Sequence, residues 1–137
     1  MDKVLNYLAL ARKAGKAELG EEPVGAAARA LHAHLILVAS DASDHTWRRA
    51  KSFAAGTHQQ CIRLGYTKDE MGFAIGRQAL AIAAITDAGM ALAMVEALGQ
   101  PEKYKPVIEA LTERVNRLRQ RQSEAKAHQR NIRKGKK

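Results

Sequence analysis

Two continuous apolar runs constrain the fold of this chain more than any other feature. His32–Ser40 reads HAHLILVAS, and Leu80–Thr86 reads LAIAAIT. Runs of this kind, without the alternation of a half-exposed strand, are typical of strands covered on both faces. Each run is followed by a residue suited to begin a helix, Ser43 after the first and Asp87 after the second. The two runs therefore predict a small sheet buried between two layers of helices.

The rest of the first hundred residues alternates helix and strand. Apolar residues at helical spacing, helix caps and glycines predict nine elements. In chain order these are a helix ending near Ala14, a short strand before Gly20, a helix from Glu21, the strand 32–40, a helix from 44 to about 55, a strand 60–65, a short helix opened by the capping box Thr67–Glu70 and ending at Gly76, the strand 80–86, and a helix 88–98. The fold class is therefore α/β, a three-layer α/β/α sandwich with a small mixed four-stranded sheet.

The last 37 residues are expected to form a basic helical extension. Pro101 is a suitable first helical residue. An apolar stripe then follows at spacings of four and three residues: Tyr104, Ile108, Leu111, Val115 and Leu118. The stripe either docks on the sandwich or pairs with a helix of a partner. Beyond Leu118 we expect a solvated basic helix that frays into disorder. This divides the chain into a domain at residues 1–100 and an extension at residues 101–137.

The net charge of +9 is concentrated in this extension. Residues 1–100 contain 11 Lys and Arg against 10 Asp and Glu, a balance of +1, and residues 101–137 contain 12 against 4, a balance of +8. A nearly neutral body with a basic extension favours a polyanion as partner, most often nucleic acid. The alternative is a tail that serves only solubility.

Cysteine content and apolar tracts suggest the cellular location. The single cysteine, Cys61, excludes an internal disulfide and argues against a thiolate metal site. The longest apolar tract, residues 79–98, is broken by Asp87, Gly89 and Glu96, so no membrane span is expected. The N-terminal residues form an amphipathic pattern that differs from a secretory signal. We therefore expect a cytoplasmic protein.

The stretch Lys16–Leu31 contains the N-terminus of a helix, called the helix mouth below. A few strand-like residues lead to a glycine corner at Gly20, and Glu21, Glu22 and Pro23 begin the next helix. The first N–H groups of a helix lack partners and carry partial positive charge, which suits phosphates and irregular base edges. The alternative is that the two carboxylates simply compensate the helix dipole on a solvated surface.

Residues that would support catalysis are better explained structurally. His32 and His34 alternate at the start of a strand, so they face opposite sides and do not chelate one metal. Asp41 and Asp87 fit turn and cap positions, and Cys61 fits a small buried hydrophobe. We therefore expect no catalytic residue, metal, cofactor or small-molecule substrate.

Trp47 has two interpretations. It is either a packed anchor of the helix 44–55 or a platform on which a base stacks. The burial habits of large aromatic residues favour the anchor.

Several segments, in this order along the chain, resemble the kink-turn RNA-binding ribosomal protein family, of the large-subunit L-seven-Ae type. They are LARKAGKAELGEE, LILVASDAS, DEMGFAIGR and AIAAITDAG. The chain is most similar to the small bacterial ribosomal-protein-like members. The resemblance covers Asp2–Leu98 and implies an RNA-binding sandwich without catalytic activity.

The resemblance also implies which residues contact RNA. In the family, the glycine corner and helix mouth read approximately G-x-N-E-x-x-K, with an arginine four residues after the lysine. Here the Asn-Glu pair falls on Glu21 and Glu22, directly after the corner residue Gly20, the lysine falls on Gly25, and the arginine falls on Arg29. The second contact surface is the loop before the last strand, which here contains Arg77, Gln78 and Ala79.

Two of these positions depart from the family pattern. Glu21 replaces an asparagine, which both donates and accepts hydrogen bonds, with a carboxylate that only accepts. Gly25 replaces a lysine and so removes a cation. Each charged hydrogen bond lost costs about 1.5 to 3 kcal/mol, so both departures predict weaker kink-turn binding.

Two functions follow as hypotheses. The first is a ribosome-associated RNA-binding protein, part of a ribonucleoprotein, whose basic tail adds phosphate contacts to structured RNA, with kink-turns as candidate targets. The second is a protein-interaction module of the same fold that has lost kink-turn binding and docks a partner through the Tyr104–Leu118 helix.

Overall fold

The computed structural model describes residues 2–135, with side chains described up to residue 129. Its elements are α1 (Lys3–Lys13), β1 (Ala17–Leu19), α2 (Glu21–Arg29), β2 (Leu35–Val38), α3 (Asp44–Ala54), β3 (Gln60–Arg63), α4 (Lys68–Ala74), β4 (Ile82–Ile85), α5 (Ala88–Ala97) and α6 (Lys105–Gly135). The nine elements expected in the first hundred residues are all present in the predicted order.

The sheet is mixed and four-stranded, as predicted. Its strand order is β1-β4-β2-β3, so β1 and β3 are the edge strands. β4 pairs antiparallel with both β1 and β2, and β2 pairs parallel with β3. The residue pairs Leu19↔Ala83, Ile82↔Val38 and Val38↔Arg63 fix the register. β2 and β4 are therefore the central strands, which explains why they carry the two continuous apolar runs.

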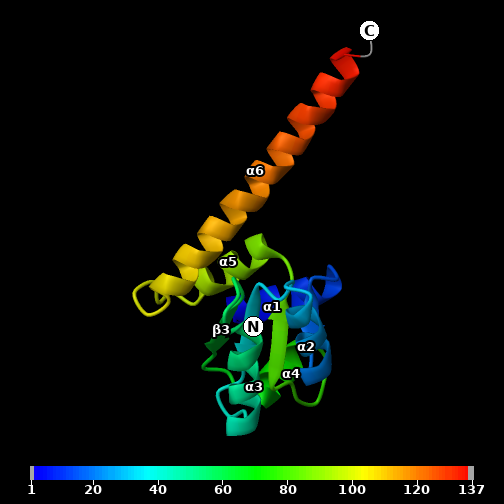
Figure 1. The fold of residues 1–137 in the computed structure, drawn as a ribbon. Coiled ribbons are helices and arrows are strands. Elements are labelled where there is room, and N and C mark those ends of the chain that lie inside the picture. The colour runs from blue at the N-terminus through cyan, green and yellow to red at the C-terminus, as the bar shows by residue number, and fades with distance from the viewer. Residues whose placement is uncertain (1, 136–137) are drawn as a thin grey trace.

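Two separate cores pack against the two faces of the sheet, which confirms the three-layer sandwich (Figure 1). On one face, α2 and α3 cover a small core of valine, isoleucine and alanine that includes Val24, Ile36 and Ala84. On the other face, α1, α4 and α5 cover a larger core with Leu8, Leu37 and Met94. Small side chains dominate the α2 and α3 layer, so those helices approach the sheet closely.

The helices begin at the caps that the sequence indicates. Ser43 Oγ accepts a hydrogen bond from Thr46 N (3.1 Å), and Asp87 Oδ2 accepts one from Met90 N (2.8 Å). Thr67 and Glu70 form the expected capping box. These bonds satisfy N–H groups that a helix start leaves unpaired, so each cap fixes where a helix meets the sheet.

The strands are shorter than the apolar runs that predicted them. The run 32–40 contributes only four strand residues, because the end of α2 turns back on itself before β2 begins. Leu31 has a left-handed φ of 63°, and His32 N donates to Ala27 O (2.9 Å). Residues that flank a strand can also be buried and apolar, so an apolar run in the sequence does not show where the hydrogen-bonded pairing of the strand ends.

α6 begins at Lys105, so the prediction that Pro101 occupies its first position is wrong. Residues 101–104 form a turn instead. Pro106 provides the reason: in a helix that began at 101 its ring would clash with the preceding turn, whereas in α6 it lies in the first turn, where its missing N–H costs nothing.

The apolar stripe of α6 docks on the sandwich. Tyr104, Leu111 and Val115 are buried, and Ile108 is half-buried. Tyr104 and Leu111 belong to the same core as α1 and α5. Of the two alternatives for this stripe, the structure therefore contains the intramolecular one, and the protein-interaction hypothesis loses the surface on which it rested.

Beyond Leu118 the helix continues to Gly135, where the sequence predicted fraying; residues 136 and 137 of that prediction lie outside the described residues. Arg117 Nη2 donates to Glu113 Oε1 (2.6 Å), and Gln120 Nε2 donates to Glu124 Oε1 (3.3 Å). Pairs at this spacing stabilise a helix that lacks an apolar face. Among the described residues, no helix is long and apolar enough to cross a membrane.

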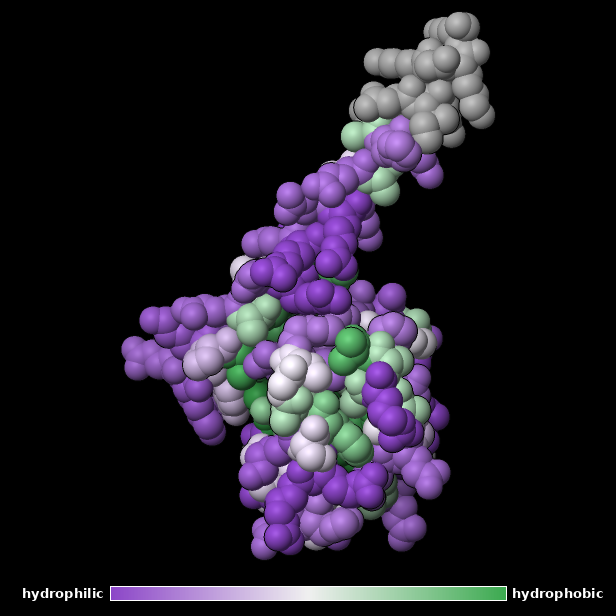
Figure 2. All heavy atoms as spheres, in the orientation of Figure 1, coloured by the Kyte–Doolittle hydropathy of each residue, from purple (hydrophilic) through white to green (hydrophobic). Residues whose placement is uncertain are grey.

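The part of α6 from Arg119 to Gly135, called the arm below, projects from the body (Figure 1). Its visible face is mostly hydrophilic where it leaves the body (Figure 2). At 1.5 Å per residue, these 17 residues extend about 25 Å.

Candidate nucleic-acid interface

The glycine corner lies where β1 passes into α2. Gly20 has a φ of 96°, a conformation that a residue with a Cβ rarely adopts, and its N–H donates to Ile82 O (3.0 Å) in β4. α2 has no side-chain cap at its N-terminus. The first N–H groups of this helix, at Glu21 and Glu22, therefore point out of the corner toward solvent or a ligand.

The loop Arg77–Ala79 lies at the same end of the sheet, because it leads into β4 next to the corner. All three of its residues are exposed. Arg77 N donates to Gly72 O (2.9 Å), which folds the loop back onto α4. A Cβ on Gly72 would lie 2.7 Å from Ala79 Cα, so the missing side chain of Gly72 is what lets the loop approach α4.

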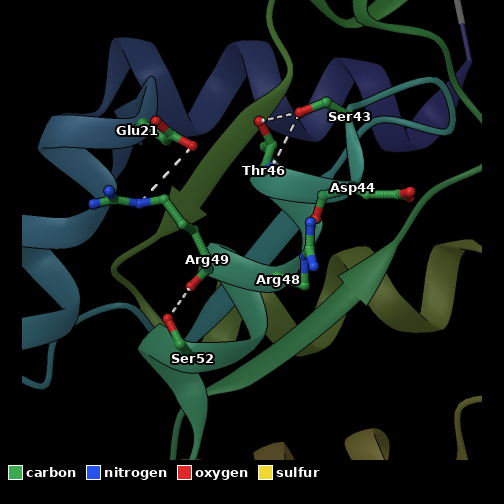
Figure 3. A network of polar contacts seen from close by, with 7 residues as sticks. All are labelled: Glu21, Ser43, Asp44, Thr46, Arg48, Arg49 and Ser52. Carbon is green, nitrogen blue, oxygen red and sulfur yellow. Dashed lines mark hydrogen bonds and ion pairs between the residues drawn. The ribbon is translucent and has the colours of Figure 1, made fainter.

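Glu21 and Arg49 form a contact between α2 and α3. Glu21 Oε1 lies 4.0 Å from Arg49 Nε, and the two side chains point toward each other (Figure 3). The same guanidinium lies 5.4 Å from the centre of the Phe53 ring. Arg49 therefore offsets part of the charge of the Glu21 carboxylate.

Gly25 is buried against Phe53. A Cβ at Gly25 would lie 3.1 Å from Phe53 Cζ and 3.4 Å from Arg29 Nη1. The ring of Phe53 thus occupies the space where the side chain at this position would begin. A long side chain at position 25 would therefore have to displace this ring, and Arg29 and Arg49 are the cations that line the same cavity as Gly25.

An open cavity of about 550 Å³ unites most of the corner residues predicted from the sequence. Its lining contains two carboxylates and two guanidinium groups, with the full set being Glu21, Glu22, Pro23, Gly25, Ala26, Arg29 and Arg49. The structure therefore gathers Glu21, Glu22, Gly25 and Arg29 next to Gly20. It places Arg77 and Gln78 in a separate loop at the same end of the sheet.

Three residues near this end received no role from the sequence. Arg49 and Phe53 come from α3, and only the packing of α3 against α2 brings them to the corner. Phe73 is 79% exposed on α4, one residue after the carbonyl that holds Arg77 N. Its position in the segment DEMGFAIGR was available in the sequence, but its exposure depends on how α4 packs.

A row of residues connects the corner to the opposite edge of the sheet. Gly20 bonds to Ile82, Ile82 pairs with Val38, and Val38 pairs with Arg63. The N-termini of α3 and α4 follow β2 and β3 at this same end, where Lys68 N donates to Asp41 Oδ1 (2.8 Å). The starts of α2, α3 and α4 therefore all lie at this end of the sheet, the first two on one face and the third on the other.

The cysteine thiol and the histidine rings, which could in principle support catalysis, lie in surroundings that do not favour it. Burial raises the pKa of the Cys61 thiol to about 11, which keeps it protonated near neutral pH. His32 is exposed and His34 is buried, with the His34 ring centre 5.6 Å from that of His58. Within the described part of the chain, no three His, Cys, Asp or Glu residues are grouped to hold a metal ion.

Of the three basic residues at the end of α1 and shortly after it, Arg12, Lys13 and Lys16, two make contacts within the body. Arg12 Nη1 donates to Ile75 O (2.6 Å) at the end of α4, and Lys16 Nζ lies 3.8 Å from Asp87 Oδ1. Lys13 is exposed. The first two side chains therefore stabilise the body, and the bond from Arg12 supports the helix that carries the loop Arg77–Ala79.

The arm leaves from the other end of the sheet. α6 begins beside Arg63, where Lys103 and Val107 line a cavity with the end of β3. Three turns later, Arg114 and Arg117 line another cavity with His58 and Gln60 at the start of β3. α6 thus runs along the edge of β3 in the opposite direction and carries the arm away from the Gly20 corner.

These features define an α/β/α sandwich protein with a basic helical arm. One end of its sheet is polar and contains the N-termini of three helices. No protein-family model matches the chain, and no curated protein matches it. Among solved structures, the chain is similar to a protein of unknown function from Bacillus halodurans, with 25% identity and a TM-score of 0.67 over 72% of this chain and 99% of that chain. More than a quarter of this chain therefore has no counterpart in that protein.

A second similar structure is the Giardia lamblia 15.5kD RNA binding protein. Its identity to this chain is 16% and its TM-score is 0.59, over 79% of this chain and 86% of that chain. At this identity the likeness shows a shared fold.

Proposed function

We propose that this protein is a non-catalytic RNA-binding protein that recognises structured RNA through the Gly20 corner and the loop Arg77–Ala79. The observation that carries the proposal is the hydrogen bond from Gly20 N to Ile82 O (3.0 Å), because it holds the corner beside the strand into which the loop leads. Gly20 and Arg77 are 57 positions apart in the chain, yet the two segments share one end of the sheet. A surface of this kind offers backbone N–H groups and arginines to phosphates and base edges.

The similar Giardia protein supports the proposal, since a protein of the same fold is an RNA binding protein. The charge distribution supports it independently, because 12 of the 23 Lys and Arg residues lie in residues 101–137. We further propose that the protein acts in the cytoplasm in association with the ribosome.

Kink-turned RNA is the structured RNA that we propose as the target. Arg49 and Arg29 both line the corner cavity and so place cations beside Gly25, where the family has its lysine. The pairing of Glu21 with Arg49 reduces the repulsion between that carboxylate and a phosphate. In this proposal, Arg49 takes over from α3 the role that the lysine has on α2.

The test is a titration of a kink-turn RNA and a straight duplex of equal length with the full chain and with the double variant Arg29→Gln, Arg77→Gln. Each charged hydrogen bond contributes about 1.5 to 3 kcal/mol, so the double variant should bind the kink-turn RNA about two to four orders of magnitude more weakly. Wild-type protein should prefer the kink-turn RNA over the duplex.

The matched control is Lys3→Gln with Lys13→Gln, which removes the same charge from two exposed positions of α1. This control should change affinity much less than the corner variant. Equal losses in the two double variants would show that the corner is only part of a general electrostatic attraction. Equal affinity of wild type for both RNAs would reject the kink-turn as target.

A further inference from the structure

A second cavity lies at the edge of the sheet, between α3 and the beginning of α6. It has a volume of about 490 Å³, within the range of about 300 to 1,000 Å³ that is usual for small-molecule sites. Trp47 from α3, Arg63 from β3, and Lys103 and Tyr104 from the turn before α6 line it. The chain's one tryptophan and one of its three tyrosines therefore meet at a single cavity.

Cations surround the tryptophan ring. The guanidinium carbon of Arg63 lies 4.8 Å from the centre of the Trp47 ring, and Lys51 Nζ lies 5.3 Å from it. Lys103 Nζ lies 5.3 Å from the centre of the Tyr104 ring. No acidic residue among the described side chains lines the cavity, so its charge is positive and it complements an anion.

The combination of flat rings, a guanidinium plane and lysines is the chemistry that binds an unpaired nucleotide. Bases stack on aromatic and guanidinium planes, and phosphates are held by cations. Trp47 is only half-buried, with Arg63 lying against its ring. Among the described residues, the buried Nε of Arg63 has no hydrogen-bond partner, so the guanidinium is held against the Trp47 ring rather than by a polar group.

The cavity also lies at the same end of the sheet as the Gly20 corner. Arg63 ends the row Gly20, Ile82, Val38, Arg63, and three strand spacings of about 4.8 Å place it roughly 14 Å from Gly20. An RNA held at the corner can therefore extend a flanking nucleotide across the start of α3 to this cavity.

We infer that this cavity binds one unpaired nucleotide of an RNA strand, with its base against Trp47 and Arg63 and its phosphate at Lys103. The inference rests on the proposed RNA-binding function but concerns a different site. The sequence left two interpretations of Trp47, a packed anchor and a platform for a stacked base. The inference combines them: the residue anchors α3 and also offers an aromatic surface to a ligand.

The test uses the fluorescence of Trp47, which reports on this cavity alone because the chain has no other tryptophan. The full-length protein is titrated with a single-stranded RNA of about eight nucleotides, a length within the range of about 4 to 16 nucleotides that single-strand-binding domains occupy. We expect saturable quenching, with affinity at least tenfold tighter for the oligonucleotide than for adenosine monophosphate. Equal affinity for the mononucleotide would overturn the assignment to an RNA strand, and equal quenching by oligoglutamate would overturn the nucleotide assignment.

Variants separate the contacts. Lys103→Gln, an exposed position, should weaken binding of the oligonucleotide about tenfold, and Arg63→Gln should do the same, as expected for the loss of one charged contact each. With a fluorescein-labelled oligonucleotide, Trp47→Leu should lose affinity by anisotropy, whereas Trp47→Phe, which keeps an aromatic ring, should retain most of it. Lys13→Gln is the control and should leave the affinity unchanged; an equal loss in this variant would contradict the site.

The corner variant Arg29→Gln, Arg77→Gln distinguishes this inference from the proposed function. It should still show quenching of Trp47 by the short RNA. If quenching is absent while wild type binds structured RNA through the corner, the inference alone is overturned. If quenching is present while the corner variant binds structured RNA as tightly as wild type, the proposed use of the corner is overturned and the inference stands.

Discussion

Gly72 determines where the loop Arg77–Ala79 lies. A Cβ at this position would come within 2.7 to 2.9 Å of three backbone atoms of Ala79, and backbone cannot move aside as a flexible side chain can. Gly72→Ala should therefore destabilise the protein by about 1 to 3 kcal/mol, as overpacking does. It should also displace the loop and weaken binding of structured RNA. Denaturant unfolding and RNA titration of the same preparation measure both effects.

Gly89→Ala is the matched control, since Gly89 also lies in a helix. A Cβ there would meet only Asp87 Oδ2, at an ordinary contact distance of 3.5 Å. Alanine is favoured over glycine in helices by up to about 1 kcal/mol, so this variant should be neutral or more stable. A Gly72→Ala variant as stable as Gly89→Ala would show that the loop does not depend on the contact.

The residues at the corner show which part of the site the sequence can predict. The glycine corner and the helix that follows it placed Gly20 and Glu22 from the residues themselves, whereas Arg29 was assigned only through the family resemblance. The partners of Glu21 and Gly25 could not be identified in this way. Arg49 and Phe53 lie more than 20 residues further along the chain, and they reach the corner only through the packing of α3 on α2.

At the scale of elements, the docking of α6 involves a buried histidine. His34 is 8% exposed, and its Nδ1 has no hydrogen-bond partner in the described part of the chain. Burial, followed by the charge of Arg114 on α6, lowers the pKa of His34 from 6.5 to about 4. His58 and His32 add smaller effects in the same direction, and Asp87 opposes them. A protonated His34 would therefore face a cation on the docked helix.

This lowered pKa makes stability depend on pH. As the pH falls below 6.5, the unfolded chain takes up a proton at His34, whereas the folded protein does so only near pH 4. The contribution of His34 to stability is therefore lost between these values as the pH falls. The free energy of unfolding should drop by about 2 kcal/mol more in wild type than in His34→Gln between about pH 7.5 and about pH 5.

The exposed His45 on α3 provides the control. Its variant His45→Gln should follow the pH dependence of wild type. Should His34→Gln follow wild type as well, His34 would not be the group that couples acid to stability. Because Arg114 on α6 disfavours protonated His34, acid should also weaken the docking of α6 in wild type before the sheet unfolds, which amide hydrogen exchange can follow.

Element boundaries separate what the sequence predicts well from what it does not. Caps and glycines located the helices because each supplies or permits a specific backbone bond, as Ser43 and Asp87 do. Strand ends were placed too far out, because apolar burial continues past the ladder. The start of α6 was misplaced by four residues although the sequence contained the decisive residue, Pro106, whose ring excludes an earlier start.

At the scale of the whole molecule, the corner and the arm lie at opposite ends. α6 shares the core up to Val115, and the arm then leaves beyond the start of β3. A compact RNA bound at the Gly20 corner is thus separated from the arm by the body. In the proposed function, the arm would therefore reach either a distant part of a large RNA, such as ribosomal RNA, or a second RNA segment. This separation could not be predicted from the sequence, since it depends on the direction in which α6 crosses β3.

A truncation after Leu118 tests whether the arm adds phosphate contacts of its own. This boundary keeps Tyr104, Leu111 and Val115 in the core, whereas an end at residue 100 would remove them. The truncation removes eight Lys and Arg residues and one Glu, so the net charge falls from +9 to +2. If the arm engages about five phosphates, the slope of log K against log salt for a large RNA should be shallower in the truncated protein by roughly 3.5 to 4.5. Binding of a small kink-turn RNA, which reaches only the corner, should change much less.

A full-length variant with Arg119→Gln, Arg121→Gln and Lys126→Gln keeps the helix but removes three charges, so its slope should lie between those of wild type and the truncation. Each removed contact should change the slope by about 0.7 to 0.9, because one counterion is released for each phosphate that a cation neutralises. Identical slopes in all three proteins would show that the arm contacts no phosphate, and its charge would then serve solubility alone. A slope that decreases equally for the small kink-turn RNA would show that the arm reaches the corner's RNA, which the opposite placement of the two surfaces does not allow for a rigid α6.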